Sequence, residues 1–167
     1  ARAKPGQLTF GAGTGSAPQL AVELFKSMAG VDMLHVPYKG TGPIMPELLG
    51  GQVSMTFSTS VDTLSFAKTG RVRLLAVTGA KRLGILPDVP TMAESGLPGF
   101  ESLNWNGIVG PAKMPPTIVA KLNTEINAQL ANPELAEKLS GEALTPMPMS
   151  PDCGTQNMHW SRRDPAR

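Results

Sequence analysis

Short apolar runs alternate with segments of helical periodicity along the first half of the chain. The apolar runs lie at residues 7–10, 33–37, 52–57 and 71–78 and predict β-strands. Helical spacing follows the first three runs, at residues 19–29, 40–49 and 61–68. Because strand and helix alternate with short connections, the pattern predicts an α/β fold with a mostly parallel sheet flanked by helices.

The pattern changes after residue 79. Residues 79–103 contain Pro87, Pro90 and Pro98 and predict a connector with fixed bends and one short helix at 91–95. Residues 102–110 then predict one more strand. The longest helix is expected at 117–131, where an apolar stripe recurs, and a further short helix at 133–139. Residues 151–167 have no usable periodicity, and we expect a divergent, poorly ordered tail there.

Composition favours a globular chain of one domain or slightly more. Of the 167 residues, 41% are hydrophobic and 17% are charged, which is enough apolar material for a substantial core. The 15 basic and 13 acidic residues are scattered, so no basic stripe indicates a nucleic-acid partner. The chain has no apolar run long enough for a membrane span, and residues 1–5 lack the apolar core of a signal peptide.

The most distinctive local feature is the small-residue segment at 11–18, between the first strand and the first helix. Glycines allow the backbone to approach a ligand closely, and a helix N-terminus offers unpaired N–H groups, so the segment predicts an anion site. The alternative is a tight strand-to-helix turn without a ligand. A nucleotide-binding loop is disfavoured because no Gly-Lys-Ser/Thr ending is present. The candidate ligand-binding residues are Gly13, Thr14, Gly15, Ser16 and Ala17.

Other polar residues have weaker claims to function. Ser58 and Thr59 follow the third predicted strand, where they either contact a ligand or cap the next helix. His35 lies in an apolar strand and is interpreted as a hydrogen-bonded core residue. Cys153 stands alone, and the two histidines have no partners at metal-ligand spacing, so neither a metal site nor a cofactor is predicted.

Several motifs occur in one order along the chain. Together they resemble the extracytoplasmic solute receptors of tripartite tricarboxylate transporters, the Bug (TctC) family, and the resemblance extends from about residue 5 to residue 151. The motifs are 36–40 (VPYKG), 50–53 (GGQV), 75–78 (LAVT), 81–82 (KR), 86–91 (LPDVPT) and 94–100 (ESGLPGF), followed by Trp105, Gly107 and Pro111.

The resemblance implies a two-lobed periplasmic binding protein of type II, about twice as long as this chain. Such a receptor traps a small carboxylate or dicarboxylate and delivers it to membrane transporter subunits, without catalysis or a cofactor. Residues 1–104 would form the second lobe, and residues 105–150 the returning strand and helices of the first. Family members begin with a signal peptide and nearly a full lobe before the point matching Ala1. Since residues 1–5 lack the apolar core of a signal peptide, the expected periplasmic localisation rests on the resemblance alone.

In the family, the loop matching Gly13–Ala17 holds one ligand carboxylate through backbone N–H groups and a hydroxyl. The positions of Ser58 and Thr59 there often carry an acidic residue and an amide. Two alternatives stay open: an enzyme acting on small acidic substrates, and the effector-binding domain of a transcription regulator. A missing first lobe would expose residues 102–110 and 117–131, so a dimer through this region is also expected.

Overall fold

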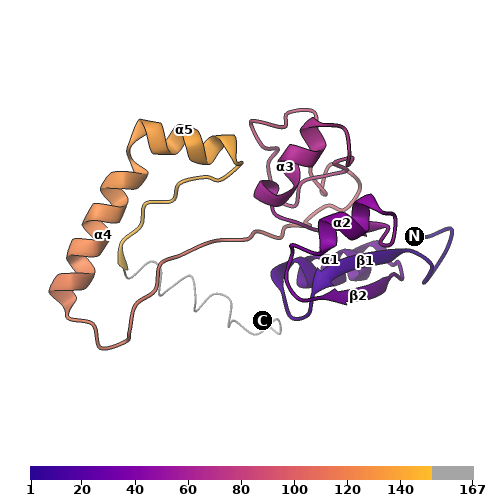
Figure 1. Cartoon of the computed structure of the whole chain (residues 1–167), viewed down its shortest axis with the longest axis horizontal. Coiled ribbons are helices and arrows are strands. Elements are labelled where there is room, and N and C mark those ends of the chain that lie inside the picture. The colour runs from indigo at the N-terminus through magenta and orange to yellow at the C-terminus, as the bar shows by residue number, and fades with distance from the viewer. Residues whose placement is uncertain (152–167) are drawn as a thin grey trace. The chain divides into compact units, whose positions relative to one another are not determined.

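The computed structural model describes residues 1–151. The features noted at Cys153 and His159, and nearly all of the expected tail, lie outside the described residues. The chain divides into two compact units, Ala1–Asn104 and Trp105–Arg167. Figure 1 labels the helices of both units and the strands β1 and β2, and each unit is described by itself below.

A three-stranded parallel sheet forms the centre of the first unit. The strand order is β2 (Leu34–Tyr38), β1 (Thr9–Gly13), β3 (Met55–Thr56). The helices α1 (Ala17–Ala29) and α2 (Ile44–Leu49) connect the strands, and α3 (Ser60–Lys68) follows β3. The predicted α/β architecture, with a parallel sheet flanked by helices, is confirmed.

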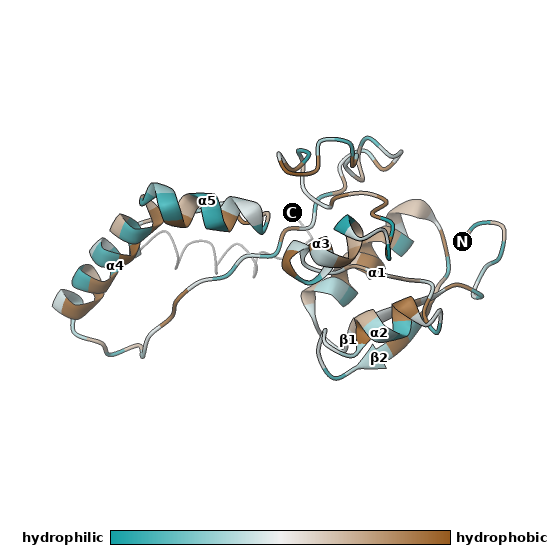
Figure 2. Ribbon diagram, turned by 45° about the horizontal axis from the view of Figure 1, so that its top comes forward, coloured by the Kyte–Doolittle hydropathy of each residue, from teal (hydrophilic) through white to brown (hydrophobic). Residues whose placement is uncertain are grey.

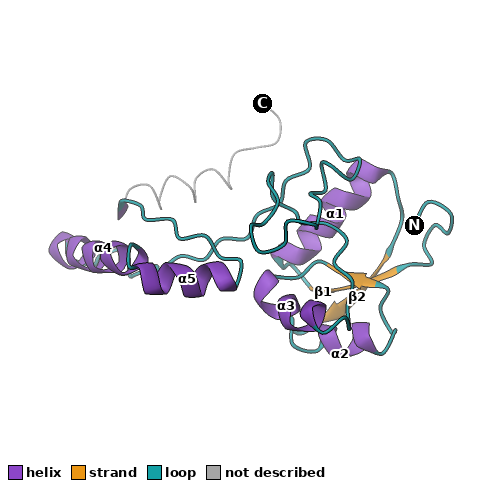
Figure 3. Cartoon of the chain, turned by 90° about the horizontal axis from the view of Figure 1, so that it is seen from above, coloured by secondary structure: helices purple, strands orange, loops and turns teal. Residues whose placement is uncertain are grey.

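Alternate residues of β1 face the two sides of the sheet. Phe10 and Ala12 are fully buried and form a core with Val22 of α1 and with Met33. Gly11 faces the other side, where a Cβ atom would lie 3.0 Å from Ile44 Cγ2 of α2. The two helices therefore cover opposite faces of the sheet, as Figure 3 shows.

The fourth predicted strand, residues 71–78, does not form. Its one ladder contact is an isolated parallel bridge between Val77 and Thr91, and Leu75 is 64% exposed. A continuous apolar run becomes a strand only where a neighbouring strand offers backbone partners. Val77 exchanges its backbone hydrogen bonds with residues 90 and 92 and not with a strand of the sheet. The third strand is also shorter than predicted, because β3 covers only Met55–Thr56 of the expected 52–57.

The expected short helix at residues 91–95 is a series of turns. The Thr91 N–H donates to Glu94 Oε2 at 2.8 Å, and the Glu94 N–H donates to Thr91 Oγ1 at 3.1 Å, which is a capping box. The helix does not continue, because Gly96 is left-handed with φ 102° and Pro98 follows. Phe100 is nevertheless buried, and its ring centroid lies 6.4 Å from that of Phe57. The connector therefore packs on the rest of the first unit, close to the end of β3.

Residues 102–110 are not a strand either. The Ser102 N–H donates to Thr78 O at 2.9 Å, but within the described part of the chain no backbone N–H of residues 103–110 donates to another backbone group. The side chains are open to solvent, with Trp105 59% and Ile108 80% exposed. Trp105 is therefore not part of the core formed by the described residues.

Two helices form about half of the described part of the second unit. The predicted helices are confirmed as α4 (Pro116–Leu130) and α5 (Pro133–Gly141). No residue of α4 is buried, and Figure 2 shows apolar and polar residues alternating along its turns. Asn127 ties the following segment to α4, because its Nδ2 donates to Met149 O at 3.0 Å. No helix within residues 1–151 combines the length and apolar character that crossing a membrane requires.

Candidate functional site

The glycine-rich segment is divided between a strand and a turn. The sequence pattern places the whole of 11–18 between strand and helix, but Gly11 to Gly13 complete β1, and only Thr14 to Ser16 turn before α1 begins at Ala17. Gly15 is left-handed with φ 73°, and nothing lies within 4 Å of a Cβ placed there. Backbone conformation, and not lack of space, therefore favours glycine at this position.

Ser16 is the N-cap of α1. Its Oγ accepts a hydrogen bond from the Gln19 N–H at 3.4 Å and donates its own hydrogen to Gly13 O at 2.7 Å. This arrangement fixes the turn at both ends. It also means that the Ser16 hydroxyl hydrogen is already engaged within the loop.

Gln19 closes the loop from the first turn of α1. Its Oε1 accepts from the Gly15 N–H at 2.6 Å, and its Nε2 lies 3.3 Å from His35 Nδ1. His35 Nε2 lies 3.0 Å from Ala12 O. Because a carbonyl oxygen only accepts, His35 carries its hydrogen on Nε2, and Nδ1 accepts from Gln19. His35 also stacks on the core residue Phe10, with ring centroids 4.9 Å apart. The prediction of a hydrogen-bonded structural residue is confirmed, but His35 is only half-buried and lies at the edge of the core.

Sequence reasoning missed Gln19. The signal was present, because Ser16 followed three residues later by a glutamine is the pattern of a capping box. In the usual box this side chain returns to the N–H of the cap residue itself. Here it reaches one residue further back, to Gly15.

Two backbone donors of the loop are free. Among the hydrogen bonds of residues 1–151, none uses the N–H of Thr14 or of Ala17. Pro18 has no N–H, and α1 has no acidic residue in its first turn. The positive end of the helix dipole is therefore uncompensated by side chains of that turn, and the loop can donate to an anion without a basic residue.

The second predicted contact region follows β3. Thr59 is the N-cap of α3: its Oγ1 accepts from the Asp62 N–H at 3.4 Å and donates to Asp62 Oδ2 at 2.8 Å. Ser58 is half-buried, and no hydrogen bond within the described part involves its hydroxyl. Because β1 and β3 are parallel, Ser58 and the Gly13–Ala17 loop leave the same edge of the sheet. The capping role applies to Thr59, whereas ligand contact by either residue stays a prediction.

Tyr38 ends β2 opposite Gly13 in the sheet register. Its Cε2 would lie 3.1 Å from a Cβ on Gly11, so the ring packs over the glycine of the central strand. Partial burial, and secondarily the Glu47 carboxylate, raise the pKa of the Tyr38 hydroxyl above its usual value of 10.0. Tyr38 is therefore a neutral side chain beside the loop, while Lys39 is exposed to solvent.

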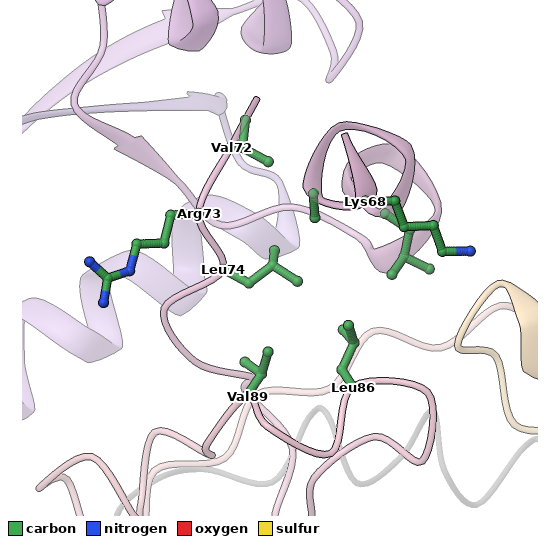
Figure 4. A pocket seen from close by; sticks show the side chains of 8 residues that line it. Lys68, Val72, Arg73, Leu74, Leu86 and Val89 are labelled. Atoms are coloured by element: carbon green, nitrogen blue, oxygen red, sulfur yellow. The ribbon is translucent and has the colours of Figure 1, made fainter. Parts of the chain in front are cut away.

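A separate hollow of about 350 Å³ lies between α3 and the connector. Figure 4 shows Leu74, Leu86 and Val89 pointing into it, whereas the charged ends of Lys68 and Arg73 point away. Its walls are apolar and present no converging polar group, so it is not suited to a carboxylate. Among the described residues, no group of three metal-ligating side chains gathers at this hollow or elsewhere.

Known proteins resemble this chain over nearly its whole length. A family profile described as "Tripartite tricarboxylate transporter family receptor" matches residues 1–159. A UPF0065 protein from the tcbD-tcbE intergenic region of Pseudomonas sp. strain P51 is 43% identical over 141 residues, which are 83% of this chain and 42% of that protein.

Solved structures share the fold. The Rpa4515 protein of R. palustris with adipate has a TM-score of 0.91 and 35% identity, and the match covers 97% of this chain and 56% of that one. MatC from Rhodopseudomonas palustris with bound malate has a TM-score of 0.82 and 32% identity, covering 94% and 55%. The periplasmic binding protein BugD has a TM-score of 0.80 and 31% identity, covering 96% and 56%.

The chain thus spans about half the length of the solved structures that it matches. Its sheet and helices are those of periplasmic binding proteins, and the motifs noted in the sequence fall within the matched residues. The resemblance stated from those motifs is confirmed, and the chain belongs to the tripartite tricarboxylate transporter receptor family.

Proposed function

We propose that this chain is the part of an extracytoplasmic solute receptor that binds one carboxylate of a small mono- or dicarboxylic acid. The observation that carries the proposal is the loop at the carboxyl end of β1, where the N–H groups of Thr14 and Ala17 are free beside the start of α1. Adipate and malate in two similar solved structures support the choice of ligand.

The chemistry of the loop favours a carboxylate. Backbone N–H groups donate short, charge-assisted hydrogen bonds to carboxylate oxygens, and the dipole of α1 adds a favourable field. The proposed contacts are the N–H groups of Gly13–Ala17 and the hydroxyls of Ser58 and Thr59. Of these hydroxyls, the one on Ser58 has no partner within residues 1–151, so Ser58 is the stronger candidate.

The remaining assignments follow from family membership. We place the protein in the periplasm, where it delivers its solute to the membrane subunits of a tripartite transporter and catalyses no reaction. In this proposal, residues 1–104 form the second lobe of the receptor, and residues 105–150 contribute to the first. The site in this chain then forms one wall of the ligand cleft.

An amide-resolved NMR titration of the 167-residue chain with adipate and malate tests the proposal. We expect the amide signals of residues 14–17 to shift with either acid, and not with an uncharged diol of the same length. If both acids leave the loop signals in place at millimolar concentration, the carboxylate function is wrong.

Ala17→Pro provides a matched variant, because it removes one N–H at the first helical position, where proline is well tolerated. Ser16 already has the extended backbone that precedes a proline, with φ −82° and ψ 158°. We expect affinity to fall about tenfold or more, since a hydrogen bond to a charged group contributes about 1.5–3 kcal/mol. Ala17→Gly keeps the N–H and is the control, with an expected affinity near that of the unchanged chain.

A further inference from the structure

We propose that Gln19 is a resident competitor for the ligand: its side-chain oxygen occupies the Gly15 N–H until a carboxylate displaces it. This inference rests on the proposed function, because it concerns the same loop. It adds a residue that sets the affinity of the site, and it assigns that residue a role opposite to that of a ligand contact.

The first observation is the occupancy of the loop donors. Of Thr14, Gly15 and Ala17, only Gly15 has its N–H engaged within the described residues, and its acceptor is Gln19 Oε1 at 2.6 Å. That separation is at the short end for an N–H to oxygen hydrogen bond. The amide oxygen of Gln19 therefore lies where an oxygen of the bound acid would accept from Gly15.

The second observation is that the orientation of the Gln19 amide is fixed. Its Nε2 faces His35 Nδ1 at 3.3 Å, and His35 is held in turn by its Nε2 donating to Ala12 O at 3.0 Å. If the Gln19 amide were reversed, an NH₂ group would face the Gly15 N–H and an oxygen would face an accepting nitrogen. His35 therefore keeps the oxygen, and not the nitrogen, of Gln19 on the loop.

Displacement is possible because the incoming group is charged. A carboxylate accepts a stronger hydrogen bond from an N–H than the neutral amide oxygen that it replaces. The exchange still loses the contact between Gln19 and Gly15, so the observed affinity is lower than the loop would provide without Gln19. Removing the acceptor from the side chain should therefore strengthen binding.

Gln19→Met tests this role, since methionine has nearly the length of glutamine but no strong acceptor for the Gly15 N–H. We expect the dissociation constant for adipate to fall about fivefold, which corresponds to about 1 kcal/mol, the net contribution of one neutral hydrogen bond. We also expect the Gly15 amide to exchange with solvent faster in the ligand-free variant. Gln19→Glu should weaken adipate binding more than tenfold, because it places a charged competitor on the same donor.

The outcomes separate this inference from the proposed function. If adipate shifts the loop amides of the unchanged chain but Gln19→Met binds equally or more weakly, Gln19 supports the site and the competitor role is overturned. Unchanged exchange at Gly15 in Gln19→Met also counts against it. If adipate shifts the loop amides of neither protein, the carboxylate function itself fails, and the competitor role fails with it.

Discussion

Two glycines near the loop are required for different physical reasons. Gly11 is in the central strand, where a Cβ would lie 3.0 Å from Ile44 Cγ2 and 3.1 Å from Tyr38 Cε2, closer than ordinary van der Waals contact. Gly15 has open space around it but a left-handed backbone, with φ 73°. The sequence shows both only as members of one glycine-rich run, and it does not tell a packing constraint from a conformational one.

We predict that Gly11→Ala destabilises the first unit by about 1–3 kcal/mol, the usual cost of overpacking a filled core. Gly15→Ala should cost about 1–2 kcal/mol through the left-handed backbone alone. Gly15→Asn is the control, with a smaller loss, since asparagine tolerates this conformation better. Urea unfolding followed by fluorescence measures all three, and a Gly15→Asn variant less stable than Gly15→Ala would contradict this explanation.

Glu94 links the stability of the connector to pH. Hydrogen bonds from the Thr91 N–H and then from Arg82 hold the pKa of Glu94 below its usual value of 4.5. The Arg82 Nε lies 2.9 Å from Glu94 Oε2. Because the folded pKa is the lower one, the stabilisation is complete above about pH 4.5 and is lost as pH falls through the folded pKa.

Glu94→Gln keeps an oxygen that can accept from Thr91 but removes the charge. We predict that the unchanged chain is the more stable of the two near neutral pH, and that the difference in unfolding free energy shrinks as pH falls below about 4.5. Urea unfolding at a series of pH values measures this difference. A constant difference across the acid range would rule out the ionised Glu94 as its source.

At the scale of elements, periodicity located the helices well and the strands less well. Each of α1, α3, α4 and α5 falls within one or two residues of its predicted bounds, because an amphipathic helix satisfies its own backbone. Residues 71–78 and 102–110 have strand-like composition but form no strand, since a strand needs a partner that periodicity does not specify. The position of the candidate loop could be predicted, whereas Gln19 is identified only by its contacts.

The N-terminus of α1 combines a structural role with a proposed binding role, and substitutions of Ser16 can distinguish the two. We predict that Ser16→Asp keeps the fold stable, since aspartate caps helices as well as serine and favours the positive end of the dipole. Its charge should repel adipate and reduce binding by at least tenfold. Ser16→Ala should instead lose about 1 kcal/mol of stability with a smaller effect on binding. Thermal unfolding and NMR titration distinguish these results, and Ser16→Asp binding adipate normally would refute an anion site here.

On the scale of the whole molecule, much apolar surface is exposed in the described part of the second unit. Ile118 and Leu122 of α4 are 48% and 47% exposed, and Val109 is 73% exposed. Monomeric proteins rarely expose contiguous apolar patches of large area. The predicted association of the chain through this region therefore stays a proposal with a physical basis.

We predict that the chain forms dimers at high concentration and that Ile118→Lys with Leu122→Lys restores the monomer. The control is Thr124→Lys, which adds a charge at an exposed polar position of the same helix. Light scattering over a concentration series gives the mass directly. A monomer at every concentration would show that these residues do not mediate association.

The position of β1 in the sheet has a consequence for how the first unit folds. Both partners of β1 lie later in the chain: Thr9 pairs with Leu34, and Phe10 pairs with Met55. During synthesis, β1 is therefore made before either of its partner strands, and this sheet cannot be completed until residue 56 has left the ribosome. Pairings at such separations close slowly, so we expect refolding in milliseconds or longer, with Phe10 exposed to other chains until its partners arrive.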